Sequence, residues 1–236
     1  MMTKILRSPI TTVVLFVLAA ALLIGGGIGT AQSAPRIQSG DYRAQVQLTD
    51  IKTAILEKTN PQGDFVQRSG DDDLLTTFLA DNNEDEIKIG KTYPYELAVR
   101  NSVSTENGID QYVRVTVQKY WTDGKDQTIK HTDLDPDLIE LHFVEGNGWT
   151  IDKKASTKER TVLYYADTLA PGEDSAPFTD TLTINGKVVT AVSQLADGTN
   201  EYDYEGLKFR IKAKVDAVQT HNGEEAMTSA WGRTNK

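Results

Sequence analysis

The chain has 236 residues, 25 Lys and Arg against 34 Asp and Glu, and no cysteine. A formal net charge of -9 repels phosphate, which argues against a nucleic-acid-binding protein unless a clear basic patch is present. The missing cysteines exclude disulfides and thiolate chemistry, and three histidines (His131, His142 and His221) leave little scope for a histidine-rich zinc site.

The first 31 residues have the pattern of a secretory signal peptide. Lys4 and Arg7 precede an apolar run of twelve residues, 13–24. This length is typical of a signal-peptide core and well short of the roughly 20 residues that span a bilayer. Small residues then predict cleavage after Ala31 or after Ser33. We therefore predict a helical signal peptide over 1–31 and secretion of the remainder, with an uncleaved membrane anchor as the alternative.

The first predicted strand after this segment covers residues 42–48. Its apolar residues alternate with polar ones, which is the period of a half-buried strand; they are Tyr42, Ala44, Val46 and Leu48. A second run over 51–58 predicts another strand, and the polar stretch 60–73 predicts a loop. Apolar spacing over 74–79 predicts a short helix, started by the aspartates at 71–73, because negative charge is favourable at a helix N-terminus.

The pattern of apolar residues in the centre and the C-terminal half predicts further strands. Runs over 93–99 and 113–117 alternate cleanly and predict an antiparallel pair joined by a long connection. The remaining predicted strands are 138–143, 149–151, 160–166, 179–184, 188–192 and 207–215. The last of these has one apolar and one basic face, and the stretch 170–173 predicts a turn with Gly172 at positive φ.

The C-terminus predicts a short helix. Asn222 can cap its start, Glu225 follows at the third position, and Gly232 supplies its stop. Met227 and Trp231 lie four residues apart and therefore face the same side, so we expect Trp231 to pack onto the strands.

Together these elements predict an all-β fold: an antiparallel β-sandwich or jelly roll with short peripheral helices, preceded by the signal-peptide helix. No change in composition and no internal repeat divides residues 32–236, so a single β-sandwich domain is expected.

Catalytic motifs are not found in the sequence. It contains no His-Glu-x-x-His pair, no Gly-x-Ser-x-Gly elbow and no phosphate-binding loop, so we expect a protein that is not an enzyme and holds no cofactor. Alternate aspartates at Asp133, Asp135 and Asp137 could bind calcium weakly. An acidic turn is the preferred interpretation, because Pro136 interrupts the run and no bidentate Glu follows.

Several segments in this order resemble the TasA/camelysin family of exported Gram-positive proteins, whose signal peptides are removed by a SipW-type signal peptidase. The segments are 95–101, 109–115, Tyr120-Trp121, 137–141, Trp149, Tyr164-Tyr165, 169–173, 217–219 and 230–232, and 25–30 resembles that signal type. The aromatic-Phe-Ser-Asp pattern common in the family is absent after Thr30.

The resemblance implies a jelly-roll protein of the cell surface or extracellular matrix, some of whose relatives assemble into biofilm fibres by donating the mature N-terminal strand. Here that donor strand would be residues 42–48, and the partners would be other copies, related matrix subunits and the signal peptidase. Alternatively, 42–48 pairs within its own domain. A second hypothesis is a non-catalytic module that binds polysaccharide or a wall component through Tyr120, Trp121 and Trp149. Camelysin was classed as a metallopeptidase, but no zinc motif supports that activity here.

Overall fold

The structure, a computed structural model, describes residues 51–68, 74–106, 108–125, 129–194 and 200–234. Contacts divide the chain into two units, 1–47 and 48–236, and all described residues belong to the second. The predicted signal helix, its cleavage residues Ala31 and Ser33, the predicted strand 42–48 and the aspartates at 71–73 therefore lie outside the described residues. Within the described part, no helix is long and apolar enough to span a membrane.

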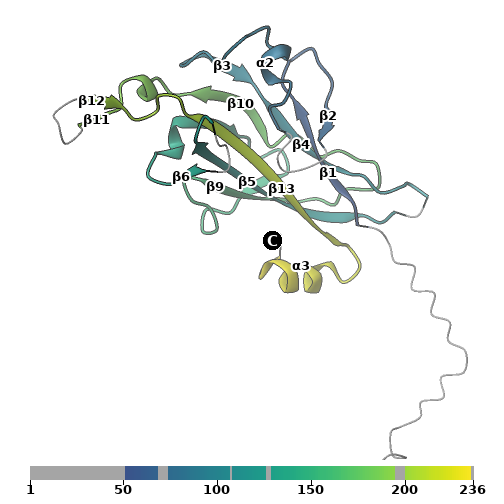
Figure 1. Cartoon of the computed structure of the whole chain (residues 1–236). Coiled ribbons are helices and arrows are strands. Elements are labelled where there is room, and N and C mark those ends of the chain that lie inside the picture. Colours follow the sequence, from purple (N-terminus) through teal and green to yellow (C-terminus); the bar gives the residue numbers. More distant parts are fainter. Residues whose placement is uncertain (1–50, 69–73, 107, 126–128, 195–199, 235–236) are drawn as a thin grey trace, which may run out of the picture. The chain divides into compact units, whose positions relative to one another are not determined.

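Two three-stranded antiparallel sheets are joined along β4. The first has the order β2 (Val66–Arg68), β1 (Thr53–Lys58), β4 (Glu96–Asn101), and the second β3 (Thr92–Pro94), β10 (Thr179–Ile184), β7 (Ile139–Phe143). The segment before β10 continues along β4, where the N–H of Phe178 donates to the carbonyl of Leu97 at 2.8 Å and that of Ser175 to Val99 at 2.8 Å. These bonds connect the two sheets (Figure 1).

The five-stranded sheet is built on the two longest strands. β13 (Lys208–Gln219) and β5 (Gln111–Thr122) pair antiparallel over all twelve residues. β9 (Arg160–Tyr165) and β8 (Trp149–Ile151) continue the sheet, while β6 (Lys130–His131) pairs with the end of β5. Every strand pair that is described is antiparallel, and the all-β prediction is confirmed.

The remaining elements are short. A separate hairpin joins β11 (Val192–Gln194) to β12 (Asn200–Tyr202). The helical pieces are α2 (Phe78–Asp81), the 3-10 turns η2 (Pro136–Leu138) and η3 (Gly186–Val189), and α3 (Gly223–Trp231). α3 ends at Gly232, whose φ of 72° is the left-handed conformation expected of a C-terminal stop.

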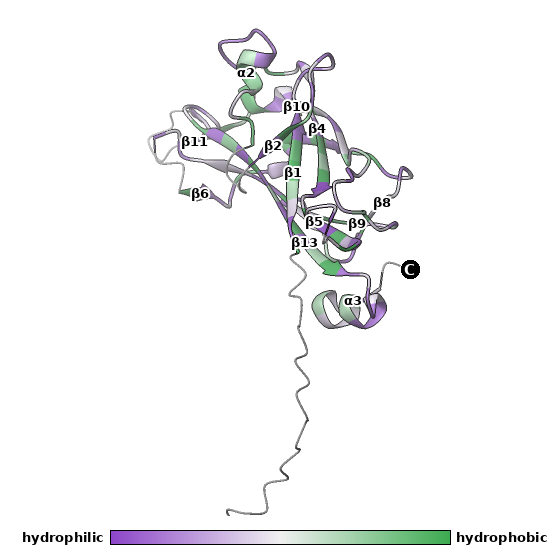
Figure 2. Ribbon diagram, turned by 90° about the vertical axis from the view of Figure 1, so that its right-hand side faces the viewer, coloured by the Kyte–Doolittle hydropathy of each residue, from purple (hydrophilic) through white to green (hydrophobic). Residues whose placement is uncertain are grey.

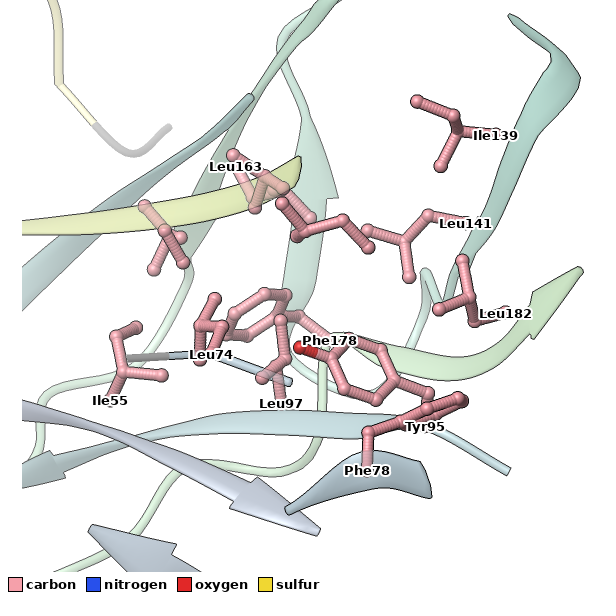
Figure 3. Close-up of a cluster of buried hydrophobic side chains, with 14 of the residues drawn as sticks. Ile55, Leu74, Phe78, Tyr95, Leu97, Ile139, Leu141, Leu163, Phe178 and Leu182 are labelled. Atoms are coloured by element: carbon pink, nitrogen blue, oxygen red, sulfur yellow. The ribbon is translucent and has the colours of Figure 1, made fainter. Parts of the chain in front are cut away.

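Alternate residues of the strands form the core. On β5, Val113, Val115 and Val117 are buried, and their neighbours in sequence point to the other face. Figure 3 shows that side chains from the three-stranded sheets and from the five-stranded sheet share one core. Tyr95 and Phe78 lie beside Phe178, with Leu163 of β9 above them in this view. Each such buried side chain stabilises the fold by roughly 1.5–3 kcal/mol relative to its exposed state.

A buried carboxylate ties this core to the segment before α2. Glu57 of β1 accepts hydrogen bonds from the Tyr95 hydroxyl at 2.7 Å, from the Leu75 N–H at 2.7 Å and from Arg68 Nε at 2.6 Å. Burial and, after it, the nearby Glu57 charge raise the pKa of Tyr95, so the Tyr95 hydroxyl stays protonated and can donate to Glu57. Leu75 has a φ of 67°, a left-handed conformation that is costly for a leucine and that the bond to Glu57 holds in place.

The predicted pairing of 93–99 with 113–117 is wrong. β4 pairs with β1, and β5 pairs with β13 and β9. The run 93–99 also divides at Tyr95, since β3 hydrogen-bonds to β10 while β4 hydrogen-bonds to β1. Alternation identifies which side chains face a core, but it does not identify the neighbouring strand.

Several local predictions also need correction. The predicted loop 60–73 contains the short strand β2. Of the predicted strand 188–192, Val188 and Val189 belong to η3, which starts where the Asn185 side chain accepts the Lys187 N–H, and only Val192 belongs to a strand, β11. The helix predicted over 74–79 begins only at Phe78, after the left-handed Leu75. Asn222 does not cap α3 with its side chain, because it adopts a left-handed conformation itself.

We predict that Glu57→Ala lowers the free energy of unfolding by about 3 kcal/mol, because it leaves Arg68 and the Tyr95 hydroxyl without their buried partner. Urea denaturation measures this. Glu96→Ala is the matched control: Glu96 pairs with Lys58 at 3.2 Å near the surface, and its loss should cost less than about 1 kcal/mol. Equal losses in the two variants would contradict the assignment.

Candidate functional site

A large apolar groove opens at the end of the molecule where β13 begins. Its volume is about 980 Å³. The apolar side chains that line it come from α2 and its neighbouring loops, η3, β12 and the paired ends of β5 and β13: Leu75, Leu79, Ile87, Ile89, Trp121, Ile184, Val188, Val189, Tyr202, Tyr204, Leu207 and Phe209. Figure 1 places α2 and the β11–β12 hairpin at this end, away from α3.

Three of the lining side chains are exposed although they are apolar. Ile89, Val189 and Tyr202 are 46%, 53% and 54% exposed, and they come from three separate segments of the chain. Acidic residues, Asp85, Glu86 and Glu205, stand beside them. A contiguous apolar surface with a charged rim is the signature of an interaction site, whereas single exposed apolar residues are ordinary.

The floor of the groove is rigid. Trp121 of β5 lies opposite Phe209 of β13 and meets the Tyr204 ring edge-on at 4.8 Å. The Trp121 indole N–H donates to the Asp135 carbonyl at 3.0 Å, and the Asp135 N–H donates to the Tyr204 hydroxyl at 3.1 Å. Burial raises the pKa of Tyr204. These contacts fix the aromatic floor between the five-stranded sheet and the η2 segment.

One wall of the groove is α2, held against the end of β1 by polar contacts. The Thr59 hydroxyl donates to the Asp81 carboxylate, and the Asn82 amide donates to the Thr59 carbonyl at 3.0 Å. Hydrogen bonds from Thr59, and then from Thr77, hold the pKa of Asp81 below its ordinary value. Leu79 thereby keeps its place in the wall.

The chain enters the described fold at the opposite end of the five-stranded sheet. The carbonyl of Lys52 accepts the Ser102 N–H at 2.9 Å, and the preceding Asn101 side chain donates to the Leu169 carbonyl at 2.9 Å. Leu169 in turn bridges to Gln111, the first residue of β5. β1 therefore starts at the Gln111 end of β5.

The start of β1 and the apolar groove lie at opposite ends of the five-stranded sheet. Gln111 is paired with Gln219, the last residue of β13, whereas the groove lies at Lys208, the first. Eleven residue steps along a strand separate these ends by about 37 Å.

The aspartates considered for calcium take part in local contacts. Lys158 Nζ lies 3.3 Å from Asp135 Oδ1 and 3.1 Å from Asp137 Oδ2, and Asp133 lies 3.9 Å from His131. The Asp137 N–H, followed by Lys158, lowers the pKa of Asp135. Lys158 thus supplies the positive charge between two of these carboxylates. Across the part of the chain that is described, no group of three or more His, Asp or Glu could hold a metal ion.

The aromatic residues considered for sugar binding are mostly inside the protein. Trp121 and Trp149 are only 5% and 1% exposed, and the Trp149 indole N–H donates to the Ala176 carbonyl at 2.7 Å. Their predicted role as exposed stacking platforms is therefore wrong, because the inward face of a strand carries each of them. Tyr120 points to the outer face, where the Lys130 ammonium lies 5.1 Å from its ring.

The sequence did not indicate the groove. Ile89 lies in a loop and Tyr202 belongs to a three-residue strand, and neither falls within a predicted element. Val189 falls within the predicted strand 188–192 but lies in a 3-10 turn. The only available signal was the presence of isolated large apolar residues within polar stretches, which single residues on any surface can produce.

A scan against models of protein families, a search of curated proteins and a search of solved structures each give no match to this chain. The groove is therefore interpreted from its own chemistry.

We predict that Asp81→Asn destabilises the protein at pH 7 by about 1 kcal/mol. The native state lowers the pKa of Asp81, so its contribution is present above the unfolded pKa of about 3.9 and is lost as the pH falls through the lower native pKa. The difference between wild type and variant should shrink below about pH 4, as measured by urea denaturation at pH 7, 5 and 3.

Asp64→Asn is the control, because Asp64 is exposed and its substitution should change stability little. A wild-type advantage that grows as the pH falls would contradict the assignment of the ionised Asp81 to the groove wall.

Proposed function

We propose that this chain is a secreted, non-catalytic structural protein of the cell surface or extracellular matrix, which assembles when the strand 42–48 of one copy enters the apolar groove of the next. One observation carries the proposal: the groove exposes Ile89, Val189 and Tyr202 at the end of the five-stranded sheet opposite the start of β1. The first described strand, β1, therefore starts at the end of the sheet away from the groove.

The chemistry of the two surfaces matches. The strand 42–48 offers Tyr42, Ala44, Val46 and Leu48 on one face, and the groove lining is mostly apolar. Burying one against the other removes apolar surface of both from water, which favours association. Because donor and acceptor are different surfaces, the contact is head-to-tail, and its repetition gives an open filament when the rotation between successive copies does not close into a ring.

The proposal also includes a jelly-roll topology and export directed by a signal peptide. The antiparallel sheets and buried core support a jelly-roll type of β-sandwich, as the resemblance to the TasA/camelysin family implies. The basic and apolar pattern of residues 1–31 supports export, with removal of the signal peptide after Ala31 or Ser33 by a signal peptidase.

The proposal predicts that Val46→Asp and Val189→Asp each weaken self-association by at least about 100-fold, because each places a charge in an apolar contact. Sedimentation velocity and negative-stain microscopy measure the association. Gln47→Asp adds the same charge to the other face of the strand, and Val66→Asp adds it to a valine that is 50% exposed but does not line the groove. Both control variants should assemble as the wild type does.

Mixing the two defective variants tests the direction of assembly. The Val46→Asp copy keeps its groove and the Val189→Asp copy keeps its strand, so the mixture should form heterodimers and stop there. A mixture that stays monomeric, or a Val189→Asp variant that still forms filaments, would rule out the groove as acceptor.

A further inference from the structure

The outer face of the five-stranded sheet is basic, although the whole chain is acidic. Residues directly opposite each other in an antiparallel pair point to the same face. Since Val113, Val115 and Val117 point inward, the alternate residues of β13, β5 and β9 point outward. The basic residues among them are Lys208, Arg210, Lys212, Lys214, Arg114 and Arg160, and Asp216 is the acidic one.

A hollow of about 340 Å³ lies on this face beside the end of α3. Figure 1 shows α3 next to the last part of β13, and Figure 2 shows that α3 carries both hydrophobic and hydrophilic residues. The hollow is lined by the guanidinium groups of Arg114, Arg160 and Arg233 and by one carboxylate, that of Asp152. The other lining residues are uncharged: Thr116, Ala155, Val162, Tyr164, Trp231 and Gly232.

Aromatic rings and short ion pairs hold the guanidinium groups in position. Arg233 lies 4.6 Å from the centre of the Tyr164 ring and pairs with Asp152 at 2.9 Å. Arg114 lies 5.5 Å from the centre of the Trp231 ring and pairs with Asp216 at 2.7 Å. Because these contacts already fix the side chains, little rotamer entropy remains to be lost on binding a ligand.

Two of these arginines keep donors for a ligand. Arg160 donates through Nε and Nη2 to the Ala155 carbonyl, at 3.2 and 2.9 Å, and Arg233 donates through Nε to Thr234 and through Nη1 to Asp152. Nη1 of Arg160 and Nη2 of Arg233 make no hydrogen bond within the described residues. Each of these two nitrogens carries two N–H donors, which can donate to a carboxylate oxygen.

We propose that this hollow binds the carboxylate groups of an acidic polysaccharide. Arg160 and Arg233 would hold a carboxylate, while the partly exposed Trp231 provides an apolar surface for the sugar ring. The proposal is independent of the groove, because the hollow lies on the outer face of the sheet and shares no lining residue with it.

The charge of the whole chain favours a polysaccharide over a nucleic acid. A DNA duplex carries one charge per about 1.7 Å of axis, so it experiences strong repulsion from a chain of net charge -9. A polymer with one carboxylate per sugar carries fewer charges along the same length. Tyr164 is also buried, so it offers no free face on which a base could stack.

The test is titration of the protein with polygalacturonate at low salt, followed by tryptophan fluorescence and calorimetry. Trp121 and Trp149 are buried in the core, so a fluorescence change should report Trp231, and Trp231→Phe should abolish it while calorimetric binding persists. Arg160→Gln and Arg233→Gln should each weaken binding about tenfold. Arg160→Lys, which keeps the charge but loses the planar guanidinium and its two hydrogen bonds to the Ala155 carbonyl, should also weaken it.

Arg100→Gln is the matched control, because Arg100 is an arginine of β4 in a surface pair with Asp174 and lies outside the hollow. It should bind polygalacturonate as the wild type does. Neutral dextran should not bind, and a 20-base-pair DNA duplex should bind more weakly than polygalacturonate.

Three results would overturn the proposal. They are the absence of polygalacturonate binding by a folded protein, an equal loss of affinity in Arg100→Gln, and tighter binding of the duplex than of polygalacturonate. Circular dichroism of each variant establishes that it is folded before its affinity is compared.

Discussion

The buried carboxylate of Glu57 is the constraint on which the described fold depends most. It lies on β1 and receives hydrogen bonds from Arg68 on β2, from the Tyr95 hydroxyl beside β4 and from the Leu75 N–H. An isolated charge at this depth would be very costly, so the three donors must be present together. Leu75 and Leu79 both line the apolar groove, so the shape of that groove depends on an ion buried behind it.

Much of the strand content follows from alternation, but the arrangement of strands does not. The alternating runs at 113–117 and 207–215 fall almost wholly within the two longest strands, although each observed strand, of twelve residues, is longer than the run that predicted it. The three-residue strand β2 was missed, since Val66 to Arg68 shows no pattern in a polar stretch. The partner of β4 was also mistaken, because pairing across the fold is decided by contacts such as Ser175 with Val99, far apart in sequence.

The sequence indicated the basic face that carries the hollow, but it did not indicate the apolar groove. The basic face was predictable from the lysines that alternate along residues 207–215, although its hollow needed Arg233 and Trp231 from beyond the strand. The groove was not predictable, because its exposed residues come from a loop, a 3-10 turn and a short strand. The groove lies at the Lys208 end of β13 and the hollow at the Arg114–Asp216 pair, so a strand and a polymer could bind one copy at the same time.

The position of β13 as an edge strand of its sheet affects the tendency of the protein to aggregate. Among the described strands, β13 pairs only with β5, and a long outermost strand is a common site of unwanted side-by-side aggregation. Lys208 and Lys214 place like charges along this strand, so two such margins repel each other when they approach. Side-by-side aggregation through this strand is thereby disfavoured.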